Sequence, residues 1–138
     1  MKLSLYTFVI ILLAFFTGCE NNNGSDNPGG EPSGDLAEQV QAHNQNDEFE
    51  DALDLLREAD QNDNEVQQMQ ETIHMNYALY LTYEAEHLGM TERMPDALRH
   101  YRRVLEFNPD HEQAQEEIDQ IEGIYEQLGR DIPEGVAE

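Results

Sequence analysis

The chain has a single cysteine and a single lysine, and it lacks both a long apolar run and a strand-like pattern. One cysteine excludes an intramolecular disulfide. The apolar run 8–16 is shorter than the roughly 20 residues that a membrane-spanning helix needs. From residue 35 onward no segment alternates polar and apolar side chains, and only Pro95, Pro109 and Pro133 interrupt the chain. These absences exclude a β class and favour an all-α fold.

Basic residues are scarce, with seven against thirty acidic residues and a formal net charge of −23. Without Lys2, six arginines would remain against the same thirty acids, a formal charge of −24. Because Lys and Arg bind phosphate, this balance excludes nucleic acid as a partner and excludes attraction to anionic lipid. The charge is consistent with simple solubility, or with a salty exterior that screens self-repulsion.

The N-terminus carries an export pattern. Lys2 precedes the apolar run 8–16, and residues 16–19 have the order Phe-Thr-Gly-Cys. A charged start, a short apolar run and small residues before a cleavage point are typical of a signal peptide. The order around Cys19 resembles a bacterial lipobox, with Phe where Leu is usual. An ordinary secretory signal with an incidental cysteine is the alternative.

The lipobox resemblance implies that residues 1–18 are a lipoprotein signal peptide and that Cys19 carries acyl chains. Several chains, at about 0.8 kcal/mol per buried CH₂, would anchor the protein permanently. The implied location is the cell envelope, as an outer-membrane lipoprotein on the periplasmic or surface face. Residues 19–34 follow as a predicted disordered tether, since residues 20–34 contain no aliphatic or aromatic side chain. Fifteen such residues reach roughly 20 Å.

Residues 35–130 have the apolar period of helices and form the predicted folded domain, with 131–138 as a C-terminal tail. The first helix is expected over 36–44 and the second from Phe49. The third is expected over 65–88, with Gly89 as its stop. The fourth is expected to open at Pro95 and to end before Pro109, and the fifth to stop at Gly129. Five helices in hairpin order predict an antiparallel α-hairpin stack.

Small and large residues recur along these helices at fixed steps. Ala97, Tyr101, Val104 and Pro109 follow one another at steps of four, three and five. A second set is Ala52, Leu56 and Ala59, and a third is Leu81, Thr82 and Gly89. The spacing resembles that of tetratricopeptide (TPR) repeats. The resemblance implies a TPR-like solenoid of about two repeats plus a C-terminal capping helix.

The repeat length departs from the family. Ala52 and Ala97 stand 45 positions apart, 11 more than in the usual repeat of about 34. Most of the surplus lies before Gly89, which predicts a third helix extended by about two turns. Because about three repeats are usually needed for a stable solenoid, self-association or partner binding is expected to complete the stack.

The resemblance also implies a binding surface. In the family, the first helix of each hairpin lines a concave surface on which peptides or helices dock. On the third helix this points to Asn76, Leu79, Tyr83 and Glu86. Tyr83 is the favoured contact, because tyrosine is enriched at binding hot spots. The alternative is that its side chain only packs between helices.

Two charged features have open interpretations. Arg99, Arg102 and Arg103, with Arg93 nearby, form a basic cluster that either binds an acidic partner or pairs with neighbouring acids. The acidic stretch 110–126 is either a solvated face or a surface for cations or basic partners.

Chemistry-bearing motifs are missing from the sequence. The five histidines have no metal-binding spacing, and no nucleophile or phosphate loop is recognisable. We therefore expect no enzyme, no cofactor and no metal. The predicted function is a membrane-anchored scaffold or adaptor for a protein partner. The alternative is a self-assembling, acidic structural or protective surface lipoprotein without a dedicated groove.

Overall fold

A computed structural model describes residues 33–134, which fold into five α-helices. The helices are α1 (Ser33–Gln45), α2 (Phe49–Glu58), α3 (Asn64–Tyr83), α4 (Met90–Phe107) and α5 (Glu112–Gln127). Within the described residues there is no strand, which confirms the all-α class. The predicted signal peptide, Cys19 and the tether up to residue 32 lie outside the described residues. Residues 33 and 34, predicted as tether, instead belong to α1.

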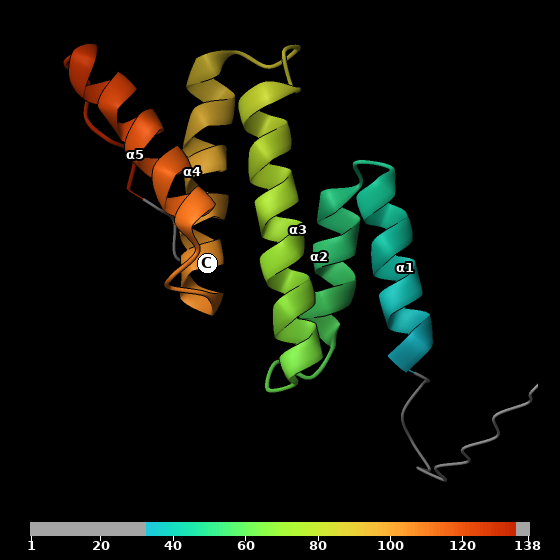
Figure 1. The fold of residues 1–138 in the computed structure, drawn as a ribbon. Helices are drawn as coiled ribbons and strands as arrows, with labels where there is room; N and C mark the ends of the chain where they lie inside the picture. The colour runs from blue at the N-terminus through green and yellow to red at the C-terminus, as the bar shows by residue number, and fades with distance from the viewer. Residues whose placement is uncertain (1–32, 135–138) are drawn as a thin grey trace, which may run out of the picture.

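The helices form antiparallel hairpins joined by short connections. Figure 1 shows two layers, with α1, α3 and α5 nearer the viewer and α2 and α4 behind them. The most extensive packing is between α3 and α4, and each other helix packs against its neighbours in the chain. The predicted hairpin order is therefore the order in space.

Local capping explains where several helices begin. Asp63 precedes α3 and its carboxylate accepts a hydrogen bond from the Glu65 amide at 2.8 Å. His111 precedes α5 and its Nδ1 accepts from the Ala114 amide at 3.2 Å. Each bond satisfies an amide that the first helical turn leaves without a partner.

Residues 33–134 contain two hydrophobic cores. The N-terminal core consists of Val40, Phe49, Ala52, Leu56, Val66 and Ile73. The C-terminal core is larger and consists of Met75, Ala78, Leu81, Ala85, Met94, Ala97, Leu98, Tyr101, Val104, Ala114, Ile118 and Ile121. Tyr77 and Tyr80 on α3 pack against both cores. The helix α3 is thus shared by the two halves of the fold.

The residues of the predicted repeat signature are mostly packing positions. Six of them are buried, namely Ala52, Leu56, Leu81, Ala97, Tyr101 and Val104. The Tyr101 hydroxyl lies 3.2 Å from the Thr82 hydroxyl, which joins α4 to α3. Ala59 is half-buried at the end of α2, whereas Gly89 and Pro109 are exposed in connections.

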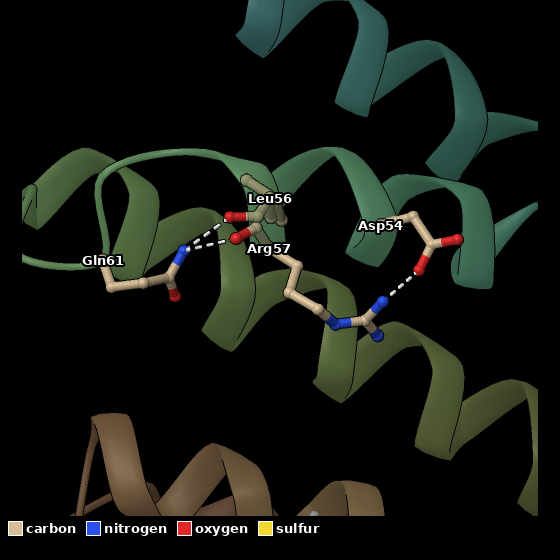
Figure 2. A network of polar contacts seen from close by, with 4 residues as sticks. All are labelled: Asp54, Leu56, Arg57 and Gln61. Atoms are coloured by element: carbon tan, nitrogen blue, oxygen red, sulfur yellow. Dashed lines mark hydrogen bonds and ion pairs between the residues drawn. The ribbon is translucent and has the colours of Figure 1, made fainter.

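The connection between α2 and α3 is held by one glutamine. The side-chain amide of Gln61 donates to the Leu56 carbonyl at 2.7 Å and to the Arg57 carbonyl at 3.4 Å (Figure 2). Its own side-chain oxygen accepts from Gln70, which is buried, at 2.7 Å. Gln61 therefore adds a side-chain donor to the last carbonyls of α2, where the Leu56 carbonyl also accepts from the Ala59 amide at 3.2 Å, and it attaches that end to α3.

The predicted end of the third helix is wrong. The helix α3 ends at Tyr83 rather than at residue 88, and Leu88 is 36% exposed in the following connection. Two of its last carbonyls, those of Leu81 and Thr82, accept hydrogen bonds from Arg93 Nη1 at 2.8 and 2.5 Å. The guanidinium of a later residue thus occupies carbonyls that the end of the helix leaves without a helical partner.

The predicted start of the fourth helix is also wrong. The helix α4 begins at Met90, so Pro95 lies inside it. Gly89, predicted to stop the third helix, is the residue before α4, and its amide donates to Glu92 at 3.3 Å. The proline ring removes an amide that would have bonded the Thr91 carbonyl one turn earlier. Thr91 is exposed, so its carbonyl can accept a hydrogen bond from water instead.

The predicted stop of the fifth helix at Gly129 is confirmed. Gly129 has a φ of +62°, a left-handed conformation that glycine adopts without strain. The Arg130 amide donates to the Tyr125 carbonyl at 3.0 Å, closing the end of the helix. The described part of the predicted tail is attached to the domain, because Ile132 packs on the C-terminal core and the Pro133 carbonyl accepts from Arg102 at 2.8 Å.

Candidate partner-binding surface

Tyr83 stands at the C-terminal end of α3 and points toward α5. In the described part of the chain, Tyr83 is one of four large apolar or aromatic residues that are exposed. Its exposed fraction is 53%. Its hydroxyl donates to the Glu117 carboxylate, with distances of 2.8 and 2.7 Å to the two oxygens. This hydrogen bond, more than desolvation, raises the pKa of Tyr83. The ring is therefore held in place while much of it remains open to solvent.

The other predicted contact residues lie in different environments. Asn76 is half-buried and its amide donates to Asn44 on α1 at 3.0 Å. Leu79 is half-buried and packs on the C-terminal core. Both lie on α3 as predicted, one turn apart. Glu86, predicted on the same helix, is exposed in the connection between α3 and α4.

Together these contacts define a surface built from the layer of α1, α3 and α5. Asn76 joins α3 to α1, and Tyr83 joins α3 to α5. Asn76 and Tyr83 are seven positions apart, about two helical turns, so they lie on one side of α3. We call this side of the two-layer fold the α3 face. Of the four predicted residues, it brings together Asn76, Leu79 and Tyr83.

A pocket opens farther along α5. It has a volume of about 260 Å³ and is lined by Met90, Thr91, Met94, Ile121, Ile124, Tyr125, Leu128 and Arg130. Glu117, Ile124 and Leu128 are spaced at i, i+7 and i+11, which places them along one flank of α5. The pocket therefore lies on the flank of α5 that also holds Tyr83 through Glu117.

Sequence reasoning missed this pocket. Met90 and Leu128 are 52% and 62% exposed, and both lie at its lining. The signal available was the pair Met90 and Met94, one helical turn apart in a segment that was expected to be a loop. Once α4 begins at Met90, these two side chains share one face of the helix.

The arginines of the predicted cluster find partners within the domain. Arg99 pairs with Asp96 at 3.2 Å, and Arg102 pairs with Glu122 at 2.8 Å. Arg103 pairs with Glu106, and Arg93 binds the end of α3. These partners favour the interpretation of internal ion pairs over an acidic-partner site.

Two histidines meet at the boundary between α3 and α4. The Nδ1 atoms of His74 and His100 are 2.8 Å apart, so one donates to the other. Burial lowers the pKa of His74 to about 4 and that of His100 to about 3. Arg103 and Arg99 near His74 act in the same direction. The pair is thus neutral at ordinary pH and joins the two helices.

Three side chains of metal-ligand type gather at the turn between α1 and α2. They are His43, Glu48 and Asp51, with possible ligand atoms within 4.8 Å of one another. His43 Nδ1 and Glu48 already pair at 2.8 Å, and both acids are exposed. The pairing of His43 with Glu48 accounts for the proximity of these two side chains, and we assign no metal to the group.

Comparison of the chain with protein-family models, curated proteins and solved structures finds no match. The resemblances to lipoproteins and to TPR repeats therefore stay predictions based on residues of this chain. In the described part of the chain, none of the helices combines the length and the apolar character needed to cross a membrane.

Proposed function

We propose that this protein is a membrane-anchored, TPR-like lipoprotein that acts as a scaffold or adaptor for a protein partner in the bacterial cell envelope. Acyl chains on Cys19 hold it to the outer membrane, and the helical domain presents the α3 face. Its task is binding rather than catalysis.

Buried contacts support the TPR-like part of the proposal. The small residue Ala97 and the large residue Tyr101 are fully buried, and Tyr101 touches Thr82 of the preceding helix. In a repeat of this type, such small and large positions form the contact between the two helices of a hairpin. The corresponding Ala52 and Leu56 are fully buried in the N-terminal core.

The observation that carries the binding proposal is the exposure of Tyr83. An aromatic side chain costs free energy when it faces water, and this one is fixed by Glu117 with about half of its surface open. A large, pre-positioned aromatic ring loses little conformational entropy on binding, which is why tyrosine is common at hot spots. The ring is therefore suited to anchor a partner on the α3 face.

Photocrosslinking in living cells tests this proposal. A photoreactive phenylalanine analogue at position 83 keeps the aromatic ring, and the same analogue at the exposed Glu58 on α2 serves as control on the other layer. A recurrent protein adduct at position 83 that is absent at position 58 would support the adaptor. Adducts only between copies of this chain would support the self-assembling alternative, and no adduct at either position would contradict the binding surface.

A further inference from the structure

The pocket between α4 and α5 is an apolar site at the end of the helix stack. Six of its eight lining residues are Met, Ile, Tyr or Leu. Two of these residues, Met90 and Leu128, leave more than half of their surface in water. A stable end of a helix stack is normally closed by polar side chains. Exposed apolar side chains around a hollow are instead typical of a binding site.

The dimensions suit an inserted side chain. A cavity of roughly 150 Å³ holds a benzene molecule, so a pocket of about 260 Å³ admits one large aliphatic or aromatic side chain with room for a neighbour. Met90 and Met94 line one wall, and methionine side chains adapt their shape to a ligand. Two helices with an apolar cleft between them also form the kind of groove in which a third helix docks.

The acidic character of the chain and of the segments that line the pocket favours an occupant of opposite charge. The segments 84–94 and 112–131 supply all lining residues, and they carry three and seven acidic residues against one arginine each. One of these arginines, Arg93, is bound to the end of α3. Of the acids on α5, Glu117 shares the flank of Ile124 and Leu128, whereas Glu122 is paired with Arg102. A second copy of this chain, with its formal charge of −23, would be repelled. A basic partner would be attracted and correctly oriented.

We infer that the pocket between α4 and α5 binds a basic amphipathic helix of a partner protein, which inserts an apolar side chain between Met90, Met94 and Leu128 and keeps its Lys and Arg residues over the surrounding acids. The inference rests on the proposed adaptor function and specifies the chemistry of the partner. Tyr83 contacts the same flank of α5 through Glu117.

A designed peptide probe tests the site directly. This protein contains no tryptophan, so a tryptophan on the peptide reports binding without background. The probe is a helical peptide with leucines along one face, lysines on the other and one tryptophan on the apolar face. Two control peptides have the same composition in scrambled order, or glutamate in place of lysine. The expected result is saturable binding of the patterned basic peptide alone, weakened as salt is raised.

Protein variants assign the binding to the pocket. The double substitution Met90→Ser and Leu128→Ser removes exposed apolar surface and should weaken binding about tenfold, with helicity unchanged. Neutralising acids next to the lining residues, with Glu117→Gln on the same flank of α5 and Asp131→Asn beside Arg130, should weaken binding severalfold. The matched control is Glu38→Gln with Glu58→Gln, which changes the net charge equally on exposed acids of α1 and α2. Unchanged binding in the serine variant, equal effects of the two charge variants, or equal binding of the scrambled peptide would each overturn the inference.

The probe and the crosslinking experiment fail independently. A partner adduct at Tyr83 together with no saturable peptide binding would support the adaptor and overturn the pocket as its docking site. Saturable binding that depends on Leu128, without any adduct at Tyr83, would support the pocket and contradict the proposed role of Tyr83.

Discussion

Acid should destabilise this protein through its buried histidine pair. Burial keeps His74 and His100 neutral, with pKa values of about 4 and about 3 against an ordinary value of 6.5. In the unfolded chain both imidazoles become protonated as the pH falls below 6.5. The stabilisation is therefore fully present above pH 6.5, and it is lost as the pH falls toward the folded pKa values.

The magnitude follows from proton linkage. At about pH 5 the unfolded state binds close to two more protons at these sites than the folded state, so the free energy of unfolding changes by about 2.7 kcal/mol per pH unit. From about pH 7 to about pH 5 the loss from the two histidines is about 3.5 to 4 kcal/mol. Weaker repulsion among the many carboxylates acts in the opposite direction, so variants are needed to isolate the histidines.

The assay is urea unfolding followed by far-ultraviolet circular dichroism at several pH values. Substitution of His74 by Gln removes one titrating group, and the slope of unfolding free energy against pH should then fall by about 1.4 kcal/mol per pH unit. His87→Gln is the control, since His87 is exposed in the connection after α3. Equal slopes in the native chain and the His74 variant would refute the reasoning.

Three further predictions concern single side chains. Arg93→Ala should cost about 1.5 to 3 kcal/mol in unfolding experiments because it frees buried carbonyls, whereas Arg57→Ala, in an exposed pair, should cost less than about 0.5 kcal/mol. Gly123 lies in α5 with open space around it, so Gly123→Ala should raise the unfolding free energy by about 0.5 to 1 kcal/mol. Gly129 has a positive φ, so Gly129→Ala should lower the unfolding free energy by about 1 kcal/mol. Equal effects of the two substitutions would contradict the described end of α5. Cys19→Ser should abolish labelling by radioactive fatty acid and move the protein from the membrane to the soluble fraction, and retention in the membrane would exclude the acyl anchor.

The helices could be predicted where burial alone determines them. In α2, Ala52 and Leu56 recur on one face and are fully buried, so the apolar period identified both the helix and its core side. The all-α class follows from the same periodicity. Gly129 ended α5 as expected because that stop depends only on local backbone preference.

The junction between α3 and α4 could not be predicted, because a distant contact determines it. Periodicity extended the expected third helix to residue 88, but the sequence does not distinguish an apolar residue in a connection from one on a helix. The helix ends where Arg93, ten positions after Tyr83, reaches its last carbonyls. The proline at position 95 gave the opposite signal, since a proline early in a helix is common at its first position and rarer in the next turn.

The candidate site divides in the same way. Tyr83 was predicted as a contact residue from its place in a repeat pattern, and in the structure it is 53% exposed. The pocket requires Met90 and Leu128, which are far apart in sequence, to lie on facing helices. A local sequence pattern cannot show that two residues so far apart in sequence are neighbours, so the pocket becomes visible only when α5 packs on α4.

The two separate cores imply that the domain does not open all at once. The N-terminal core has fewer buried side chains than the C-terminal core, and Tyr77 and Tyr80 on α3 are common to both. Local unfolding follows contact density, so α1 and α2 should exchange their amide hydrogens faster than α4. If the chain is held to a membrane through its N-terminal side, tension reaches α1 first. Such tension would unfold α1 and α2 first, while the C-terminal core and the pocket between α4 and α5 stay folded.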